Sequence, residues 1–583
     1  MTLQKALSFV AKALAPERDF YILAAIYGVG ISLLSLATPI SVQMLINTVA
    51  NTGLATPLVV LSGALFVLLA MSGLLNALRL HLMEIFGRRF YARFVSEIAV
   101  RSIYAQNPFF ADQRRSDLFN RYFDIITVQK NMPILMIGGF TLILQAGVGF
   151  ILVSLYHPLF FVFNSVVALM IWGVWAIWGR ASVLSAIELS HRKHASAGWL
   201  EGIGSSNGFY KSQRHIASAL TGTDEVTRAY VDQHKRHFRN FFSQTLSFLF
   251  IYAAASATLL GLGGWLVIEG QLSIGQLVAA ELVLSAAFFG VSQLGAYLTY
   301  FYDMCASIEE LMHFYDVPQE EPAGRNDLEC ADSGLAFVGA RGDARGREAT
   351  LNFAVRPGAK VMAAASNHGV QRLVTNMLKR HFEPRGGFVA FGGLDVLDAD
   401  AHALRQEIIV LDRPSTIDMT IREYLRLSAE DQNPASTLEA LRVVGLESVI
   451  ASLEEGLDTR VAATGWPLST TELMQLKLAA AMLARPRVLI LSQLFDLMAE
   501  ECLRRALVHM MRDERLTVVY FTNRRADIGA DAYLYLDYDR QEYLPTFEAF
   551  RARARQDAPR MDGVSGGAPS LAARAPVALI GKE

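Results

Sequence analysis

The feature that most limits how this chain can fold is a long apolar stretch without charge. From Phe20 to Leu78 the sequence contains no Asp, Glu, Lys or Arg. A helix needs about 20 apolar residues to cross a bilayer, so this stretch is long enough for two crossings joined near residues 51–57. The sequence predicts two further pairs of crossings, at 132–178 with a turn at 156–158, and at 241–268 and 273–302 with a break at 269–271.

The distribution of basic residues predicts how these six spans are oriented. Lys and Arg are frequent after the second span and after the fourth, whereas the three other connections contain neither. Basic residues concentrate on the cytoplasmic side of membrane proteins, so both ends of the chain are expected in the cytoplasm. The two basic segments are long and amphipathic, which favours cytoplasmic extensions of the membrane helices over flexible loops.

The first 19 residues are expected to form an amphipathic elbow helix along the cytoplasmic leaflet. Leu3, Leu7, Val10 and Leu14 share one face of such a helix, and an apolar face of this kind binds at the membrane interface.

Composition excludes several other classes of function. More than half of the 583 residues are apolar, the net charge is −2, and no basic block is present, so nucleic acid is not an expected partner. Cys305, Cys330 and Cys502 are widely spaced and have no histidine at metal-ligand spacing, which indicates neither a disulfide framework nor a zinc site.

Glu281 is an acidic residue well inside the sixth predicted span. A carboxylate at this depth is expensive unless it meets a partner or water. Two interpretations remain: a solvated side chain that faces a wet central cavity, or a group that acts directly on a cationic substrate or a proton. Glu281 is therefore a candidate residue of a substrate cavity.

The segment from Lys360 to Leu378 has the pattern of a strand, a turn of small residues and a helix. A phosphate-binding loop at this place needs G-x-x-x-x-G-K-[ST]. Its glycines let backbone N–H groups surround the phosphates, its lysine binds the terminal phosphates, and its hydroxyl binds Mg²⁺. Alignment through Glu383 and Pro384 places Ala365, His368 and Val370 at the glycine positions, Gln371 at the lysine and Arg372 at the hydroxyl.

Other places that carry nucleotide chemistry are altered in the same way. The strand from Arg487 ends at Ser492 and Gln493, where a magnesium-binding aspartate and a glutamate that polarises water would stand. In the stretch that corresponds to LSGGQ, Leu468 and Ser469 are followed by Thr470, Thr471 and Glu472. In a nucleotide-binding domain of this pattern, a histidine that contacts phosphate would stand where this chain has Asn523. A metal-sensing glutamine would stand where it has Arg413 or, one residue earlier, Asp412.

The order and spacing of these five places resemble those of the ATP-binding cassette (ABC) exporters, and residues 272–318 resemble the last helix and linker of bacterial peptide and protein exporters. The resemblance implies a six-helix transmembrane domain of the ABC exporter type fused to an α/β P-loop-like nucleotide-binding domain. It also implies short coupling helices near residues 110–119 and 207–213. The expected division is an elbow helix at 1–19, a transmembrane domain at 20–315, a linker at 316–334, a degenerate nucleotide-binding domain at 335–550 and a disordered tail at 551–583.

The altered residues predict that this chain does not bind or hydrolyse ATP by its own motif. In the family two cassettes pair head to tail, so ATP and magnesium could bind only at a composite site with a partner. The expected function is a silent half of a transporter in the bacterial inner membrane, as a homodimer or with an active half-transporter. A periplasmic adaptor and a peptide or protein substrate are further expected partners. The alternatives are a silent membrane scaffold and, less favoured, an active ATPase with unusual ligands.

Overall fold

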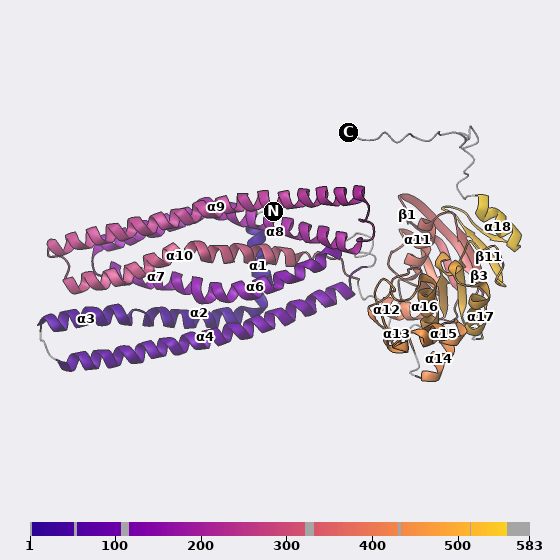
Figure 1. The fold of residues 1–583 in the computed structure, drawn as a ribbon, viewed down its shortest axis with the longest axis horizontal. Helices are drawn as coiled ribbons and strands as arrows, with labels where there is room; N and C mark the ends of the chain where they lie inside the picture. Colours follow the sequence, from indigo (N-terminus) through magenta and orange to yellow (C-terminus); the bar gives the residue numbers. More distant parts are fainter. Residues whose placement is uncertain are drawn as a thin grey trace, which may run out of the picture. The chain divides into compact units, whose positions relative to one another are not determined.

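The computed structural model describes residues 3–51, 55–106, 116–320, 331–429, 433–512 and 515–556. The chain divides into two compact units, 1–320 and 321–583. Figure 1 shows that the first unit is a bundle of long helices that run side by side and that the second contains sheets flanked by helices.

The first unit confirms the six predicted spans: within the described residues, six helical segments are long and apolar enough to cross a membrane. Its elements are α1 (Leu3–Leu14), η1 (Ala15–Glu17), α2 (Arg18–Leu34), α3 (Ala37–Asn51), α4 (Ala55–Ile103), η2 (Ser116–Tyr122), α6 (Phe123–Ile134), η3 (Leu135–Gly139), α7 (Phe140–Ser154), α8 (Pro158–Ser205), α9 (Gln213–Ile268) and α10 (Ile274–Met312).

The first and third spans are interrupted. The first is divided into α2 and α3 by a turn at Ser35 and Leu36, just before Pro39, whose missing N–H cannot complete the preceding helical turn. In the third span, α6 contains Pro133 and is followed by the π-helical turn η3 before α7 begins. Proline and π-turns are the usual causes of helix breaks.

The segments predicted to be cytoplasmic extensions are continuous with the long apolar helices, as expected. Helices α8 and α9 contain 48 and 56 residues, which is about 70–85 Å at 1.5 Å per residue and more than twice the hydrocarbon thickness. They are joined at 206–212 by turns, with Phe209 N–H donating to Ser206 O at 2.9 Å, instead of by a short helix. Of the other expected coupling helix, residues 110–115 lie outside the description, and η2 begins at Ser116.

The elbow helix is shorter than expected, because α1 ends at Leu14 and α2 begins at Arg18. Leu14 is buried in a core that also contains Ile308 of α10, with Val10 packed against it. Arg93 of α4 fixes the end of this segment through an ion pair with buried Glu17 (2.7 Å) and a hydrogen bond to Ala13 O. The side chains of Leu3 and Leu7 lie outside the described ones.

The start of the linker pairs with the end of α4. Gln106 N–H donates to Pro318 O at 2.8 Å, Glu320 N–H donates to Tyr104 O at 2.7 Å, and Ala105 and Gln319 form an antiparallel bridge between them. Val317 is buried in a small cluster with Ala105.

The first strand of the second unit is β1, which begins at Leu335. An antiparallel sheet has the order β2-β1-β4-β5, and a six-stranded sheet has the order β12-β11-β3-β10-β9-β6, in which only β12 is antiparallel to its neighbour. The strands are β1 (Leu335–Ala344), β2 (Arg347–Val355), β3 (Lys360–Ala365), β4 (Gly386–Phe391), β5 (Leu394–Asp395), β6 (Ile408–Leu411), β7 (Met419–Thr420), β8 (Arg460–Val461), β9 (Val488–Leu491), β10 (Thr517–Phe521), β11 (Ala532–Leu536) and β12 (Gln541–Leu544).

Helices cover both faces of the parallel sheet, as its two apolar cores require. One core joins β1, β2 and β4 to α11 and the other joins α13, α14, α16 and α17 to the opposite face. The helices of this unit are α11 (His368–Leu378), α12 (Ala401–Glu407), α13 (Ile421–Ser428), α14 (Pro434–Val443), α15 (Glu447–Ser452), η4 (Gly456–Asp458), α16 (Thr470–Ala484), η5 (Gln493–Leu497), α17 (Glu500–Met510) and α18 (Phe547–Gln556).

The predicted disordered tail begins too early. Residues 551–556 continue α18, where the Arg553 guanidinium lies over the ring of Tyr535 at 4.2 Å and Arg551 donates to Arg525 O at 3.1 Å. These contacts hold the basic end of α18 on the sheet. Residues 557–583 lie outside the described part of the chain, as does Cys330; Cys305 and Cys502 are buried free thiols.

Candidate nucleotide site

Three of the predicted site positions are brought to one edge of the parallel sheet. Strands β3, β10 and β9 are neighbours, so the ends of these strands place Ala365, Asn523 and Ser492 at the same carboxyl edge. Ligands of open α/β sheets bind at this edge. The structure therefore brings three residues that sequence analysis selected to the edge where ligands of such sheets bind.

The turn after β3 is closed by a side chain of its own. Asn367 is the N-cap of α11, and its carboxamide oxygen accepts hydrogen bonds from the N–H groups of Gly369 (2.8 Å) and Val370 (3.2 Å). Free N–H groups at a helix N-terminus are what binds phosphate in such a turn. Here an internal acceptor already satisfies two of them, and the sequence signal for it is an Asn directly before the helix.

The residues at the lysine and glycine positions face the protein interior or lack the required chemistry. Gln371 is 4% exposed and Val370 is fully buried, so both belong to the packing of α11 against the sheet. His368 is exposed at the first position of the helix, and Arg372 is half-buried one turn further on. The side chain at the lysine position is therefore buried and neutral.

The end of β9 likewise carries no carboxylate at the two predicted places. Ser492 is 6% exposed and caps η5, its Oγ accepting from Leu494 N–H at 3.4 Å. Gln493 is exposed in the first position of η5. A hydroxyl and a carboxamide at these positions can bind water, but they cannot replace two ionised oxygen ligands.

Asp496, four residues after Ser492, is the acid that sequence analysis did not consider. Its carboxylate accepts hydrogen bonds from Thr522 Oγ1 (2.6 Å), Asn523 N–H (2.9 Å) and the hydroxyl of Tyr520. Burial, together with the neighbouring Asp496 carboxylate, raises the pKa of Tyr520, which keeps its hydroxyl a donor.

Arg524 completes this cluster, which we call the Asp496 cluster (Tyr520, Thr522, Asn523, Arg524 and Asp496). Its guanidinium lies 3.7 Å from Asp496 and donates to the carbonyl oxygens of Phe495 (2.7 Å) and Met498 (2.6 Å). The cluster thus ties η5 to the end of β10. The backbone N–H of Asn523 is bound to Asp496, and the residue itself is exposed.

The signature-like segment forms the start of α16. Ser469 is the N-cap, and its Oγ accepts from Glu472 N–H (3.3 Å) while Ser469 N–H donates to the Glu472 carboxylate (2.7 Å). This is a capping box. Thr470 is exposed and Thr471 half-buried in the first turn, and the Glu472 charge lies against its own helix N-terminus, where it is favourable.

The region after β6 is rich in cationic groups. Lys477 of α16 donates to Arg413 O at 2.7 Å, and Arg405 donates to Lys379 O at 2.9 Å. Burial, with help from Arg405 and Lys379, lowers the pKa of His381 to about 3. Burial also lowers the pKa of Lys379, although Asp412 opposes this shift. Asp412 is thus the acidic counterpart of the cationic groups around it.

The membrane unit contains a groove of about 380 Å³ where both interrupted spans meet α10. It is lined by residues of the α2–α3 break, including Pro39, by Gly138 of η3 and Thr141 of α7, and by Gln293 and Tyr297 of α10. The polar groups in a largely apolar wall are typical of a ligand site within a helical bundle.

Glu281 lies within the sixth predicted span, and Arg79 directly follows the charge-free stretch. Glu281 accepts a hydrogen bond from Ser285 Oγ at 2.8 Å through one carboxylate oxygen, whereas its other oxygen is buried and has no hydrogen-bond partner among the described residues. Arg79, which sequence analysis did not select, is 2% exposed and donates to Asn76 (2.9 Å) and to Thr141 in the groove. Its position directly after the charge-free stretch was a signal for it.

Comparison with known proteins supports the resemblance found in the sequence. The chain is 27% identical over 239 residues to the alpha-hemolysin translocation ATP-binding protein HlyB of Escherichia coli, covering 40% of this chain and 34% of that protein. It is 28% identical over 239 residues, with the same coverage, to the leukotoxin translocation ATP-binding protein LktB of Mannheimia glucosida. The match thus spans about a third of the length of each of these relatives.

A longer match has a lower identity. The ABC multidrug transporter mdr2 of Aspergillus fumigatus is 24% identical over 543 residues, which are 86% of this chain and 66% of that protein. No protein-family profile matches the chain.

The structural comparison covers nearly the whole chain. A bacterial Atm1-family ABC exporter solved with ATP bound superposes with a TM-score of 0.76 at 15% identity, over 94% of this chain and 97% of that one. At this identity the likeness shows the fold. The chain therefore has the fold of an ABC exporter, with six helical segments among its described residues long and apolar enough to cross a membrane, and its sequence relatives include translocation ATP-binding proteins and an ABC multidrug transporter.

Proposed function

We propose that this chain is the catalytically silent subunit of an ABC-type export system, forming half of a translocation path while a partner half-transporter hydrolyses ATP. The observation that carries the proposal is the start of α11, where Asn367 binds the N–H groups that a phosphate would need and Gln371 is buried at the lysine position.

The number of replaced phosphate-binding and catalytic groups determines how much ATP affinity and turnover this chain has lost. A hydrogen bond to a charged phosphate contributes roughly 1.5–3 kcal/mol, and the loss of one preorganised charge-stabilising group slows chemistry by about 10²–10³. Several such groups are replaced here together, including both carboxylates at Ser492 and Gln493. We infer that the chain's own site has neither useful affinity for ATP nor turnover.

The Asp496 cluster weighs against an active ATPase with unusual ligands. Asp496 is the acidic residue nearest in sequence to Ser492, where a magnesium-binding aspartate is expected. Its oxygens accept hydrogen bonds from Thr522, Asn523 and Tyr520, and they face Arg524. A carboxylate committed to a guanidinium and three donors has little capacity left for a metal ion.

In the proposed setting both termini are in the cytoplasm of a bacterium and the spans cross its inner membrane. Two half-transporters enclose the path, and ATP with Mg²⁺ binds only where a partner supplies an intact phosphate loop opposite Ser469 to Glu472. The names of HlyB and LktB, which describe toxin translocation, favour a peptide or protein substrate and the participation of a periplasmic adaptor. A scaffold that keeps the fold and moves nothing is the second candidate.

The first test measures binding of a fluorescent ATP analogue with Mg²⁺ to the purified full chain. We expect no saturable binding at or below about 1 mM, which corresponds to only about −4 kcal/mol. The matched control is a repaired variant in which Ala365, His368 and Val370 become Gly, Gln371 Lys, Arg372 Ser, Ser492 Asp, Gln493 Glu and Asn523 His. Saturable binding by the unaltered chain within that range would refute the proposal.

The second test separates a transporter subunit from a scaffold. The chain is co-expressed with a half-transporter that has intact motifs, and native mass measurement identifies the dimer formed. For a subunit, the pair hydrolyses ATP, and peptide substrate stimulates that rate. A chain that stays monomeric in lipid-like conditions contradicts the transporter assignment, whereas a heterodimer without substrate-stimulated turnover supports the scaffold.

A further inference from the structure

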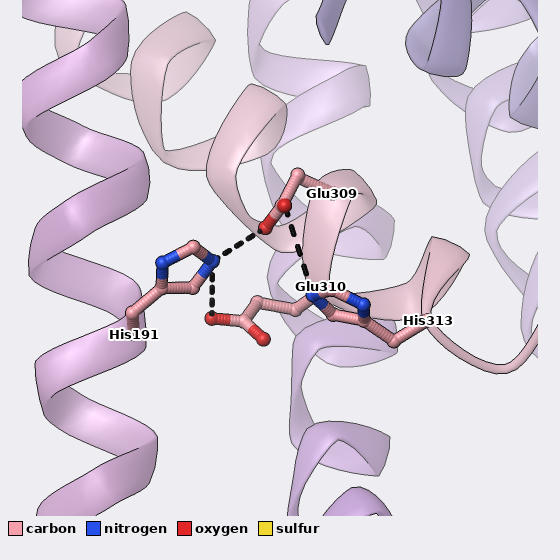
Figure 2. Close-up of side chains that lie close together, drawn as sticks. All are labelled: His191, Glu309, Glu310 and His313. Atoms are coloured by element: carbon pink, nitrogen blue, oxygen red, sulfur yellow. Dashed lines mark hydrogen bonds and ion pairs between the residues drawn. The ribbon is translucent and has the colours of Figure 1, made fainter. Parts of the chain in front are cut away.

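Four ligand-type side chains meet where the last membrane helix ends. Glu309 and Glu310 belong to the final turn of α10, His313 follows that helix directly, and His191 reaches them from α8 (Figure 2). One ligand atom from each of the four lies within 4.8 Å of every other. We call this group the His191 cluster.

The cluster is outside the hydrocarbon region. His191 is 33 residues beyond Pro158, the first residue of α8, which is about 50 Å along the helix and exceeds the roughly 30 Å of a bilayer core. The His191 and His313 side chains are 38% and 35% exposed, whereas those of Glu309 and Glu310 are 8% and 0% exposed. The histidines therefore form an aqueous entrance to two buried carboxylates.

The distances join the four side chains around a common centre. His191 Nε2 lies 2.9 Å from Glu309 Oε2 and 3.8 Å from Glu310 Oε1, and His313 Nε2 lies 3.6 Å from Glu309 Oε1. In Figure 2 both glutamates and the Nε2 atoms of both histidines point into the same space. The set is two imidazoles and two carboxylates contributed by two helices.

The other nitrogen of each histidine also faces a carboxylate. Glu188 Oε2 lies 3.8 Å from His191 Nδ1, and Asp316 Oδ2 lies 3.9 Å from His313 Nδ1. Histidines that bind metals usually donate their second N–H to such a carboxylate, which orients the ring and makes the ligating nitrogen more basic. At 3.8 and 3.9 Å these outer carboxylates are ion-pair neighbours of the two rings, not hydrogen-bond acceptors.

One buried oxygen of the cluster has no partner. Glu310 Oε2 accepts from Arg121 Nε, but Glu310 Oε1 is buried and makes no hydrogen bond within the described residues. A buried carboxylate oxygen without a donor is costly. His191 Nε2 lies 3.8 Å from this oxygen, so the unsatisfied oxygen favours the binding of a cation between them.

We propose that His191, Glu309, Glu310 and His313 bind a divalent first-row transition metal ion of the zinc class. Imidazole and carboxylate ligands in a set of four match the tetrahedral preference of Zn²⁺, with bonds of about 2.0–2.2 Å and ligand atoms about 3.4 Å apart. The ligand atoms lie within 4.8 Å of one another, and a bound ion would draw them closer together. The bound ion would clamp α8 to the end of α10, where the chain leaves the membrane unit.

The simpler interpretation is an ion-pair network in which Arg121 and protonated histidines balance the two glutamates. It accounts for Glu309 but leaves Glu310 Oε1 without a donor at hydrogen-bond distance. Zinc binding distinguishes the two interpretations. Only a metal site binds zinc saturably, and only there does the affinity for zinc depend on both histidines.

The experiment uses the full chain, purified in mild detergent without a polyhistidine tag and treated with a chelator. Zinc chloride is titrated by calorimetry, and cobalt(II) absorption reports the coordination geometry. We expect one Zn²⁺ per chain, a tetrahedral cobalt spectrum, and a loss of affinity of at least about 10-fold in both His191→Gln and His313→Gln. His234→Gln, an exposed histidine on α9 outside the cluster, should bind zinc like the unaltered chain.

A milder variant distinguishes the loss of a zinc ligand from a failure of the protein to fold. If either histidine variant fails to give a monodisperse protein, Asp316→Asn removes only the carboxylate behind His313 and is expected to weaken zinc binding about 10-fold. The proposal is overturned if the unaltered chain shows no saturable zinc binding below about 100 μM, or if affinity is unchanged in the folded cluster variants.

Discussion

The substitution Asp496→Asn tests whether the Asp496 cluster is a structural joint. The change keeps the size of the side chain but removes its charge and makes one of its two acceptor atoms a donor. Thr522, Asn523 and Tyr520 then compete for one carbonyl oxygen, and Arg524, whose side chain is 10% exposed, loses its counter-charge.

The expected loss of stability can be sized from these contacts. Breaking a fully buried pair by removing one partner costs about 3–5 kcal/mol, and hydrogen bonds to charged groups contribute about 1.5–3 kcal/mol each. Asp496 is 23% exposed, so solvent recovers part of this, and we expect a loss of about 2–3 kcal/mol. For a domain of this size that corresponds to roughly 5–10 °C in melting temperature.

The assay is thermal unfolding of the full chain in detergent, followed by intrinsic fluorescence at one scan rate for all variants. Asp458→Asn is the matched control, because its pair with Arg422 lies on the surface with side chains 63% and 56% exposed and should matter little. A melting temperature for Asp496→Asn equal to that of the control, or a loss of Mg²⁺-dependent nucleotide binding without loss of stability, would refute the structural role.

Three other predictions follow from single residues. Gln371→Lys alone should leave phosphate release at background, because groups that act as a unit recover little when one is repaired; turnover well above background in this variant contradicts the proposal. Since the His381 pKa is about 3 when folded and about 6.5 when unfolded, only the unfolded state binds the proton between these values. Stability should therefore fall by about 1.4 kcal/mol per unit as pH drops below 6.5, and a smaller decline in melting temperature toward pH 5 in His381→Asn checks this. Gly387→Ala should destabilise by at least about 2 kcal/mol, because its φ is +70° and a Cβ would lie 2.2 Å from Gly339 O. Gly393→Ala, at φ +84° with open space around it, should melt closer to the unaltered chain.

The fold could be predicted because its determinants are local in sequence. The charge-free stretch from Phe20 to Leu78 requires membrane helices whatever packs around them. The breaks at Ser35 and in η3 were not predicted, because proline and π-turns are tolerated in membrane helices when neighbouring helices satisfy the freed backbone groups.

The site positions could be predicted from spacing, but their partners could not. Asn367 and Glu472 occupy cap positions that local patterns do indicate, although the sequence analysis treated Glu472 only as a replacement within the LSGGQ-like stretch. Asp496 and Arg524 meet because β9 and β10 are neighbours. His191 and Glu309 meet because α8 packs near the end of α10. Pairings of this kind depend on tertiary contacts and leave no periodic signal in one sequence.

The short pairing between residues 104–106 and 318–320 has a mechanical consequence. Its two hydrogen bonds join the end of α4 to the segment that follows α10. A tension applied at Glu320 therefore reaches the end of α4 through these bonds as well as the end of α10 through the chain. The force is divided between two membrane helices, and a pull that tilts the sixth span also displaces the second.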